Sequence, residues 1–143
     1  MPQKPILENF SIVKRKIEVC EYQSLRQTTG WGSIENDVVE KALDKDLFSV
    51  CVLESEQIVG MGRVIGDGAI YFYIQDVIVD PGYQNKGIGK LIMESIEDYL
   101  AKNSNNNSFI GLMAAEGATQ FYEQFGYQKR PDDRPGMFKA IKK

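Results

Sequence analysis

The stretch from Ile74 to Leu100 constrains the fold of this chain more than any other part of the sequence. An apolar run ends at Val79 and is followed by Asp80-Pro81-Gly82, a combination typical of a tight turn. Further on, apolar residues recur with helical spacing and predict an amphipathic helix with one buried face: Ile88, Leu91, Ile92, Ile96, Tyr99 and Leu100. The fold must therefore place the start of a long helix beside the end of a buried strand.

Gly87 and Gly89 lie where the loop enters this helix, and they leave its backbone uncovered. The first amides of a helix have no partner within the helix, and they converge with the positive end of its dipole. Such a helix start is suited to bind an anion. The sequence therefore predicts a site for a phosphate-bearing cofactor.

The nucleotide-binding pattern GxxxxGK[ST] does not fit this loop. Gly82 and Gly87 have the required spacing, but Ile88 and Gly89 stand where a lysine and a hydroxyl residue are needed. The lysine that would reach the terminal phosphates and the hydroxyl that would bind magnesium are both missing. Hydrolysis of a nucleotide triphosphate is therefore not expected.

The dinucleotide pattern GxGxxG also fails, and it fails at two places. When the pattern starts at Gly87, its third glycine position is Ile92. When it starts at Gly60, that position is Ile65. A Rossmann-type dinucleotide site is therefore not expected either.

The pattern [RQ]-x-x-G-x-[GA] does fit the loop, through Gln84, Gly87 and Gly89. A second block, FYEQFGY, covers residues 121–127. With these two blocks in this order, the chain resembles the GNAT family of acetyl-CoA-dependent N-acyltransferases from Leu47 to Tyr127. The alternative is an ordinary glycine turn before a core helix, followed by a helix whose aromatic residues serve only packing.

The resemblance implies an α/β fold of the mixed α+β type, with a central, mostly antiparallel sheet flanked by helices. It also implies acetyl-CoA as the acyl donor. The pyrophosphate would lie on the backbone amides of residues 85–90, and the pantetheine arm would pair with the strand at 77–79 like an added strand. The implied cofactor-binding residues are Val77, Ile78, Val79, Gln84, Asn85, Lys86, Gly87, Ile88, Gly89 and Lys90.

Acetyl transfer to an amine requires two proton transfers. Deprotonation of an alkyl ammonium at pH 7 costs roughly 4–5 kcal/mol, and the departing thiolate must be protonated. The resemblance assigns protonation of the thiolate to Tyr122, whose alternative role is a core aromatic. Asp76, beside the cofactor strand, is the candidate base acting through a water, or else a structural acceptor for loop amides.

Two further positions bear on substrate binding. Trp31 lies between two glycines and is a candidate floor for the amine pocket, with simple packing as the alternative. Many family members carry an asparagine that contacts the pantetheine arm, but Ala115 occupies that position here, next to Glu116. This departure leaves the outer cofactor contacts open.

The amino-acid composition excludes several classes of function. The chain has no histidine, which excludes Ser-His-Asp and Cys-His catalysis and zinc sites with histidine ligands, and no metal is expected. Its net charge of −3 argues against nucleic-acid binding, and no apolar run is long enough to cross a membrane. Cys20 and Cys51 lack metal or redox spacing, so a reducing, cytoplasmic setting is expected.

Length and composition predict one globular domain over residues 1–143. Besides the strand and helix described first, strands are expected at residues 12–19, 48–53, 58–65, 109–113 and 137–141. Helices are expected at 20–27, at 118–125 before a C-cap at Gly126, and after Ser33, the last with an apolar face of Val38, Val39, Ala42 and Leu43.

The function expected from these observations is direct transfer of an acetyl group to a primary amine, with small-molecule amines favoured. One alternative is acetylation of a protein N-terminus or lysine, and the other is a non-catalytic acyl-CoA-binding regulatory domain. A homodimer is possible, since homodimers are frequent in the family, but no residue specifies one.

Overall fold

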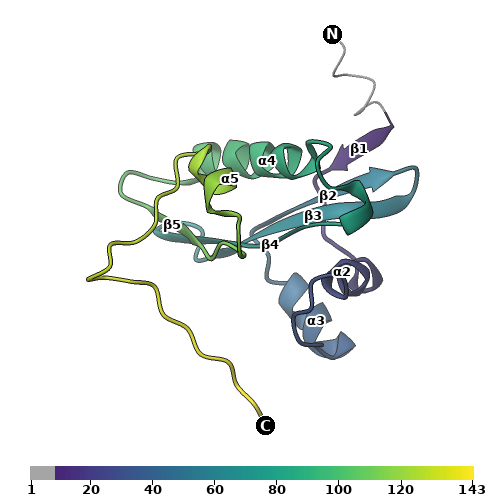
Figure 1. The fold of residues 1–143 in the computed structure, drawn as a ribbon, viewed down its shortest axis with the longest axis horizontal. Coiled ribbons are helices and arrows are strands. Elements are labelled where there is room, and N and C mark those ends of the chain that lie inside the picture. The colour runs from purple at the N-terminus through teal and green to yellow at the C-terminus, as the bar shows by residue number, and fades with distance from the viewer. Residues whose placement is uncertain (1–8) are drawn as a thin grey trace. The chain divides into compact units, whose positions relative to one another are not determined.

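The computed structural model describes residues 9–143 and falls into two compact units, the first ending at Leu112 and the second running from Met113 to Lys143. The first unit is built on a five-stranded sheet (Figure 1). Its strands are β1 (Phe10–Val13), β2 (Phe48–Glu54), β3 (Gln57–Gly66), β4 (Tyr71–Val79) and β5 (Phe109–Leu112).

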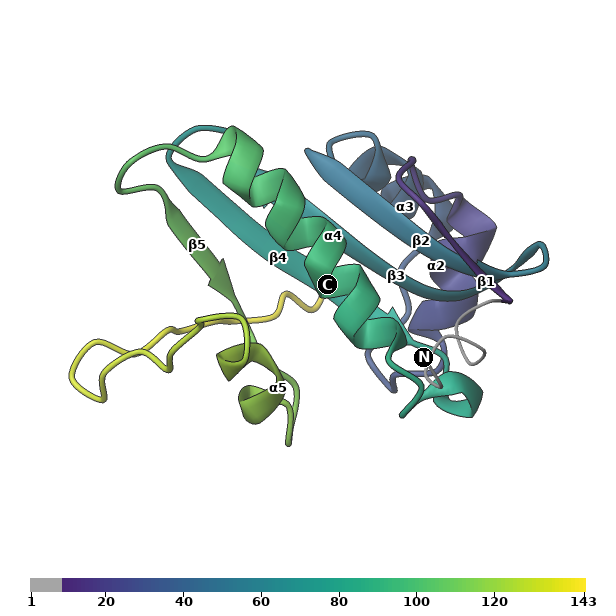
Figure 2. The same ribbon diagram turned by 90° about the horizontal axis from the view of Figure 1, so that it is seen from above.

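The strands lie in sequence order, and neighbouring strands are antiparallel except for β4 and β5, which are parallel. The long helix α4 (Ile88–Asn103) crosses one face, while α2 (Val19–Arg26) and α3 (Asn36–Leu43) cover the other (Figure 2). A short 3-10 helix, η1 (Pro81–Tyr83), precedes α4. This mixed, mostly antiparallel sheet between helices confirms the predicted fold class.

Two glycines of β3 allow α4 to lie close to the sheet. A Cβ atom at Gly62 would come within 2.6 Å of the Ile92 side chain and 3.0 Å of Ile96. A Cβ at Gly60 would come within 3.0 Å of Ile88. The glycine pair that fails the dinucleotide pattern therefore serves helix packing, because any side chain there would push the helix away from the sheet.

A second apolar layer lies between the sheet and the helices α2 and α3. It consists of buried residues from the segment before α2, from both helices and from β2, β3 and β4, namely Ile17, Tyr22, Leu25, Val39, Leu43, Cys51, Ile58, Met61 and Ile78. Burial of this layer on the face opposite α4 makes the unit a three-layer structure. The sheet is thus covered on both faces.

Two local predictions in the N-terminal region are wrong. The strand predicted over residues 12–19 ends at Val13, and α2 already begins at Val19. The Glu18 N–H donates to the Glu21 carboxylate at 3.0 Å, a contact that favours a helix start there. Val38 was expected on the buried face of its helix but is 51% exposed, because its neighbour Val39 takes the buried position.

The strand predicted over residues 137–141 is also absent. Met137, Phe138 and Ile141 are exposed, and the second unit provides no strand partner among its described residues. Alternating apolar residues alone do not make a strand, since backbone pairing must come from a neighbour. The second unit contains the helix α5 (Thr119–Glu123), which confirms the core of the helix predicted at 118–125.

Candidate active site

Strand β4 contains a bulge that changes the direction of its side chains. Met61 pairs with Ile78 and Arg63 pairs with Gln75, so that the single residue Gly62 opposes both Asp76 and Val77. Asp76 has a φ of 55°, an unusual conformation for a residue within a strand.

The bulge moves β4 side chains from one core layer to the other. Before the bulge, the Phe72 ring packs against Tyr99 of α4, with centroids 6.4 Å apart. After it, Ile78 lies in the layer beneath α2 and α3. Strict alternation would have placed both side chains on one face, so the extra residue reverses the faces.

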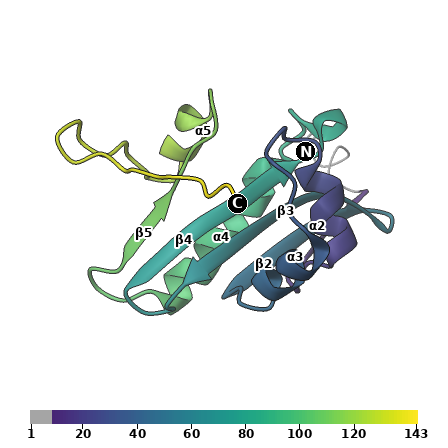
Figure 3. The same ribbon diagram turned by 90° about the horizontal axis from the view of Figure 1, so that it is seen from below.

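Among the described residues, one edge of β4 has no strand partner at its C-terminal end. The parallel pairing with β5 covers Tyr71 to Ile74 only, opposite residues 109–112, whereas β4 continues to Val79. The two strands run side by side at one end and separate toward the other (Figure 3). The edge of residues 75–79 that faces away from β3 can therefore pair with an extended ligand. The predicted cofactor strand, residues 77–79, lies on this edge.

The glycine loop follows directly, and two side chains hold its backbone in place. Asp80 accepts a hydrogen bond from the Gly82 N–H at 2.8 Å, and the Gln84 side-chain amide donates to the Val79 carbonyl at 3.3 Å. Asn85 and Gly87 have φ values of 65° and 86°, in the left-handed region. Gly87 is the N-cap of α4, and a Cβ there would meet nothing within 4 Å. The loop backbone therefore faces open space.

The first turn of α4 presents free amide groups. The Leu91 N–H donates to the Gly87 carbonyl at 3.1 Å, so helical bonding starts at that residue. The amides of Ile88, Gly89 and Lys90 precede it and have no carbonyl within the helix to bind. The Ile88 side chain is itself buried against the sheet, which leaves only its backbone for a ligand. This arrangement fits the anion site predicted from the sequence.

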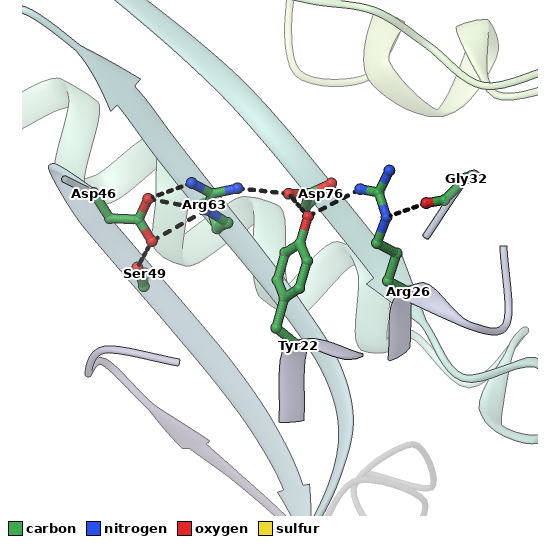
Figure 4. Close-up of polar contacts among 7 residues, drawn as sticks. All are labelled: Tyr22, Arg26, Gly32, Asp46, Ser49, Arg63 and Asp76. Carbon is green, nitrogen blue, oxygen red and sulfur yellow. Dashed lines mark hydrogen bonds and ion pairs between the residues drawn. The ribbon is translucent and has the colours of Figure 1, made fainter. Parts of the chain in front are cut away.

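Asp76 takes part in a buried charged cluster whose members lie far apart in the sequence (Figure 4). Its Oδ2 accepts a hydrogen bond from the Tyr22 hydroxyl at 2.9 Å and forms an ion pair with Arg63 at 2.7 Å. Arg63 also binds Asp46, at 2.8 Å between Nη2 and Oδ1. Ser49 donates to the same Asp46 carboxylate at 2.7 Å. The Asp76 carboxylate thus binds these side chains rather than loop amides.

The cluster raises the pKa values of Tyr22 and Arg63. Burial raises the pKa of the Tyr22 hydroxyl, and the charge of Asp76 and its hydrogen bond raise it further. Burial opposes the charge on Arg63, but the bonds and charges of Asp46 and Asp76 outweigh it and raise the Arg63 pKa. Arg63 is therefore a permanent cation and Tyr22 a neutral phenol at physiological pH.

Trp31 lies at an open groove beside α2. The groove has a volume of about 860 Å³ and is lined by Trp31 and by Cys20, Gln23 and Arg26 of α2, among others. Arg26 lies over the Trp31 ring at 5.7 Å and donates to the Gly32 carbonyl at 2.8 Å. It also donates to the Tyr22 hydroxyl at 3.0 Å. A chain of polar contacts therefore joins the Trp31 segment to Asp76 (Figure 4).

Tyr122 lies in the second unit, on α5. Its ring makes edge contacts with Phe121 at 5.0 Å and with Tyr127 at 6.5 Å between centroids. Burial raises the pKa of its hydroxyl. Gly126 follows the helix with a φ of 95°, which confirms the predicted C-cap glycine.

The structure places the predicted site residues in three groups. The cofactor strand and glycine loop are continuous, and Trp31 connects to Asp76 through side chains, all within the first unit. Tyr122 belongs to the second unit. Among residues 9–143, no group of side chains could hold a metal ion. No helix in the same range is long and apolar enough to cross a membrane.

A family model described as an acetyltransferase (GNAT) domain matches residues 17–141. The chain belongs to the GNAT acetyltransferases. Among its relatives, the probable acetyltransferase TAP2 of Glycine max is 36% identical over 137 residues, which cover 96% of this chain and 47% of that protein. The histone acetyltransferase TAP1 of Glycine max is 31% identical over 134 residues, covering 85% and 57%. The chain thus spans about half the length of these two curated relatives.

Among solved structures of GNAT type, one from meticillin-resistant Staphylococcus aureus is similar along almost its whole length. It is described as a protein of unknown function and a probable acetyltransferase, and it is 32% identical, with a TM-score of 0.87. The match covers 92% of this chain and 99% of that one. The likeness extends over both units of the present chain.

Sequence reasoning about this GNAT chain missed the side chains that surround Asp76, namely Tyr22, Arg26, Asp46 and Arg63. One signal was available. Arg63 is a charged residue within an otherwise apolar strand, and it is only 7% exposed. A charge at such a position requires a buried partner, but nothing in the sequence says which acid supplies it.

Proposed function

We propose that this chain is an acetyl-CoA-dependent N-acetyltransferase that moves an acetyl group directly to a primary amine. The observation that carries the proposal is the unpaired edge of β4 next to the free amides at the start of α4. An acyl-CoA carries an extended arm with amide groups and a diphosphate, and these two parts suit the two features. Residues 77–79 would pair with the arm, and the amides of residues 85–90 would hold the diphosphate.

The reaction requires a base for the acceptor. In the proposed mechanism, the ammonium proton passes through a water to the Asp76 carboxylate, and the free amine attacks the thioester carbonyl carbon. Asp76 is 4% exposed, so a relaying water is needed between its oxygen and the nitrogen. The carbon–sulfur bond then breaks, and the coenzyme leaves as a thiolate.

Tyr122 is the proposed acid that protonates this thiolate, and the assignment follows the family motif. Its raised pKa keeps the phenol protonated at neutral pH, as an acid must be. The same shift makes the phenol a weaker donor to a thiol of ordinary pKa about 8.5. Donation therefore depends on close positioning rather than on acid strength.

We propose small-molecule amines as the favoured acceptors, bound in the groove at Trp31. Specific features support a second candidate class. TAP1 of Glycine max is described as a histone acetyltransferase, and the groove beside α2 is open. An open groove can accept a peptide as well as a small molecule, so protein lysines and N-termini belong in the same test.

Calorimetry with acetyl-CoA tests the binding half of the proposal, and an amine panel tests the chemistry. The panel contains polyamines, arylalkylamines, short lysine peptides and free N-terminal peptides, and release of coenzyme A thiol is followed. Turnover with small amines supports the favoured class, whereas turnover with peptides alone supports the second. Acetyl-CoA binding without thiol release for any acceptor would point to the regulatory alternative.

The role of Tyr122 needs its own variant. Tyr122→Phe keeps the aromatic contacts with Phe121 and Tyr127 and removes only the hydroxyl. We expect turnover to fall about 10²-fold or more, with acetyl-CoA affinity nearly unchanged. Equal losses in both quantities would show that the tyrosine supports binding instead.

A further inference from the structure

The cluster of Asp46, Arg63 and Asp76 is costly to bury and therefore requires an explanation. The side chains of the three residues are 5%, 8% and 2% exposed, and they hold two carboxylates and one guanidinium. Buried ion pairs seldom stabilise a fold more than apolar residues of the same size would. Stability alone is thus a weak reason for this arrangement.

The position of Asp76 gives a better reason. It lies at the bulge, with a φ of 55°, next to the unpaired edge of β4. Left-handed backbone at a residue with a side chain persists only where its surroundings hold it. Arg63 and Tyr22 both bind Oδ2 and so fix the carboxylate from β3 and from α2.

The other carboxylate oxygen is left free. Within the part of the chain that the structure describes, Asp76 Oδ1 is the buried side-chain polar atom that lacks a hydrogen-bond partner. Figure 4 shows both contacts of this carboxylate converging on its other oxygen. A buried acceptor without a partner is expensive and requires an explanation, and a catalytic role is one that this position beside the unpaired strand edge supports.

Arg63 can control this oxygen because its guanidinium is divided between two acids. Its Nε and Nη2 bind Asp46, and its Nη1 binds Asp76. A planar guanidinium can do both at once in a fixed geometry, which an ammonium cannot. The charged or titratable groups facing Asp76 are Tyr22 and, through it, Arg26 from α2, Arg63 from β3 and, through it, Asp46. The helix α4 lies on the other face of the sheet (Figure 2).

We infer that Arg63, anchored by Asp46, is a positioning residue of the acyl-transfer site, which keeps Asp76 charged and turned so that Oδ1 stays free for the acceptor's proton. The inference rests on the proposed function and goes beyond it, because it assigns a role to two residues that touch neither coenzyme nor amine. Asp46 acts by holding Arg63, and Arg63 acts by holding Asp76.

Two substitutions of opposite electrostatic effect test the inference. Arg63→Gln leaves two neighbouring buried carboxylates without a cation, so one of them must take up a proton. Asp46→Asn removes the negative charge that competes for Arg63, so that Asp76 becomes the only carboxylate paired with Arg63 in the cluster. With an amine that the wild-type protein acetylates, the acid limb of the kcat/KM profile should move to higher pH in Arg63→Gln and to lower pH in Asp46→Asn. Limbs that move in the same direction, or not at all, would overturn the inference.

Arg63→Lys is the matched control. It keeps the charge but cannot bridge both acids, so kcat should fall about 10-fold or more while the acid limb stays near that of the wild type. A lysine variant as active as the wild type would contradict the positioning role. The kcat loss should exceed the change in amine KM, since a merely loosened fold would alter both.

A readout without turnover separates this inference from the proposed function. The Tyr22 pKa is raised partly by the charge of Asp76, so tyrosine-labelled protein can report that charge by NMR. Burial of Tyr22 keeps its pKa raised in every variant, but if Asp76 gains a proton in Arg63→Gln, the part of the shift that comes from the Asp76 charge should disappear and the Tyr22 pKa should drop, whereas in Asp46→Asn it should remain at the wild-type level. An unchanged Tyr22 pKa in folded Arg63→Gln would overturn the inference even if acetyl transfer is established. Asp46→Asn, an almost isosteric change, keeps the test open should Arg63→Gln not fold.

Discussion

The glycine loop and the Asp76 cluster lie at neighbouring stretches of the same strand–loop–helix segment, yet they are built in opposite ways. The loop presents backbone amides to open space, its backbone is left-handed at Asn85 and Gly87, and its own side chains Asp80 and Gln84 bond only to nearby backbone groups. The cluster is closed and depends entirely on side chains from four places in the chain. In the proposed function, the loop would recognise the coenzyme through local backbone shape, and the cluster would hold a charged base through distant partners.

Because of this difference, substitutions in the two regions should affect turnover and coenzyme affinity differently. In the loop, a side chain can be changed with little effect unless it alters the backbone conformation. In the cluster, removal of a single atom group leaves a buried charge or donor without its partner. The comparison predicts large losses of chemistry from the cluster and smaller losses of affinity from the loop.

The largest expected effect is that of Asp76→Asn. The amide keeps the size of the side chain and loses the proton-accepting charge, so kcat should fall by about 10²-fold to 10⁴-fold. Acetyl-CoA affinity, measured by calorimetry, should change little because the proposed cofactor contacts are backbone groups. Ser49→Ala is the control, because Ser49 bonds to Asp46 and takes no part in the proposed proton transfer to Asp76. This variant loses one hydrogen bond to Asp46 and should reduce kcat far less. A comparable loss in both variants would contradict the distinction between base and support.

The next effect is expected in the loop. Gly87 has a φ of 86°, and a Cβ there meets nothing within 4 Å, so alanine brings backbone strain without a clash. Strain of about 1–2 kcal/mol in the left-handed region should weaken acetyl-CoA binding by about 10-fold and leave kcat at saturation nearly intact. Asparagine tolerates this conformation, so Gly87→Asn should lose less affinity than Gly87→Ala. If both variants bind equally weakly, the space over the loop and not its conformation is what the ligand needs.

The sequence was sufficient to predict the elements whose pattern is local. The strands β2 and β3 and the helix α4 follow from unbroken runs of periodic apolar residues, and η1 with the loop follows from Asp80-Pro81-Gly82. The exposed amides at the start of α4 follow too, because a helix start needs no distant partner to expose them. Backbone features of this kind depend on residues that are neighbours in the sequence, so the sequence alone can predict them.

The features that depend on distant contacts were not predictable. No glycine in β4 marks the bulge at Asp76, so the sequence does not predict it. The bulge is recognised only from the register of β3 against β4. Residues 137–141 show the opposite error, since their alternation predicts a strand that lacks a partner. Tyr22 and Arg63 stand 54 and 13 residues from Asp76, and no spacing rule connects them.

A third prediction concerns Tyr22 in the cluster and is tested by the free energy of unfolding at different pH values. The folded state raises the pKa of this phenol, so the stability it contributes is present below about pH 10 and is lost as pH rises through the higher folded value. Tyr22→Phe also loses the bond to Asp76, which should cost about 1 kcal/mol in urea unfolding at pH 7.

Above pH 10, the stability gap between Tyr22→Phe and the wild type should narrow, because only the wild type still has this phenol to ionise. Tyr73→Phe is the matched control, since burial alone raises the pKa of that hydroxyl. Its removal should leave the pH 7 stability closer to that of the wild type. A gap that stays constant from pH 7 to pH 11 would mean that Tyr22 is not coupled to a buried charge.

The smallest expected effect is that of Lys86→Ala in the loop. Lys86 is exposed, and if the amides of residues 85–90 carry the diphosphate, its charge adds only a screened, long-range attraction. Acetyl-CoA affinity should fall by about threefold or less at physiological salt, and the difference from the wild type should shrink further as salt is raised. A loss of tenfold or more that persists at high salt would show a direct lysine–phosphate contact. The loop would then depend on a side chain as the cluster does, and the contrast between the two regions would not hold.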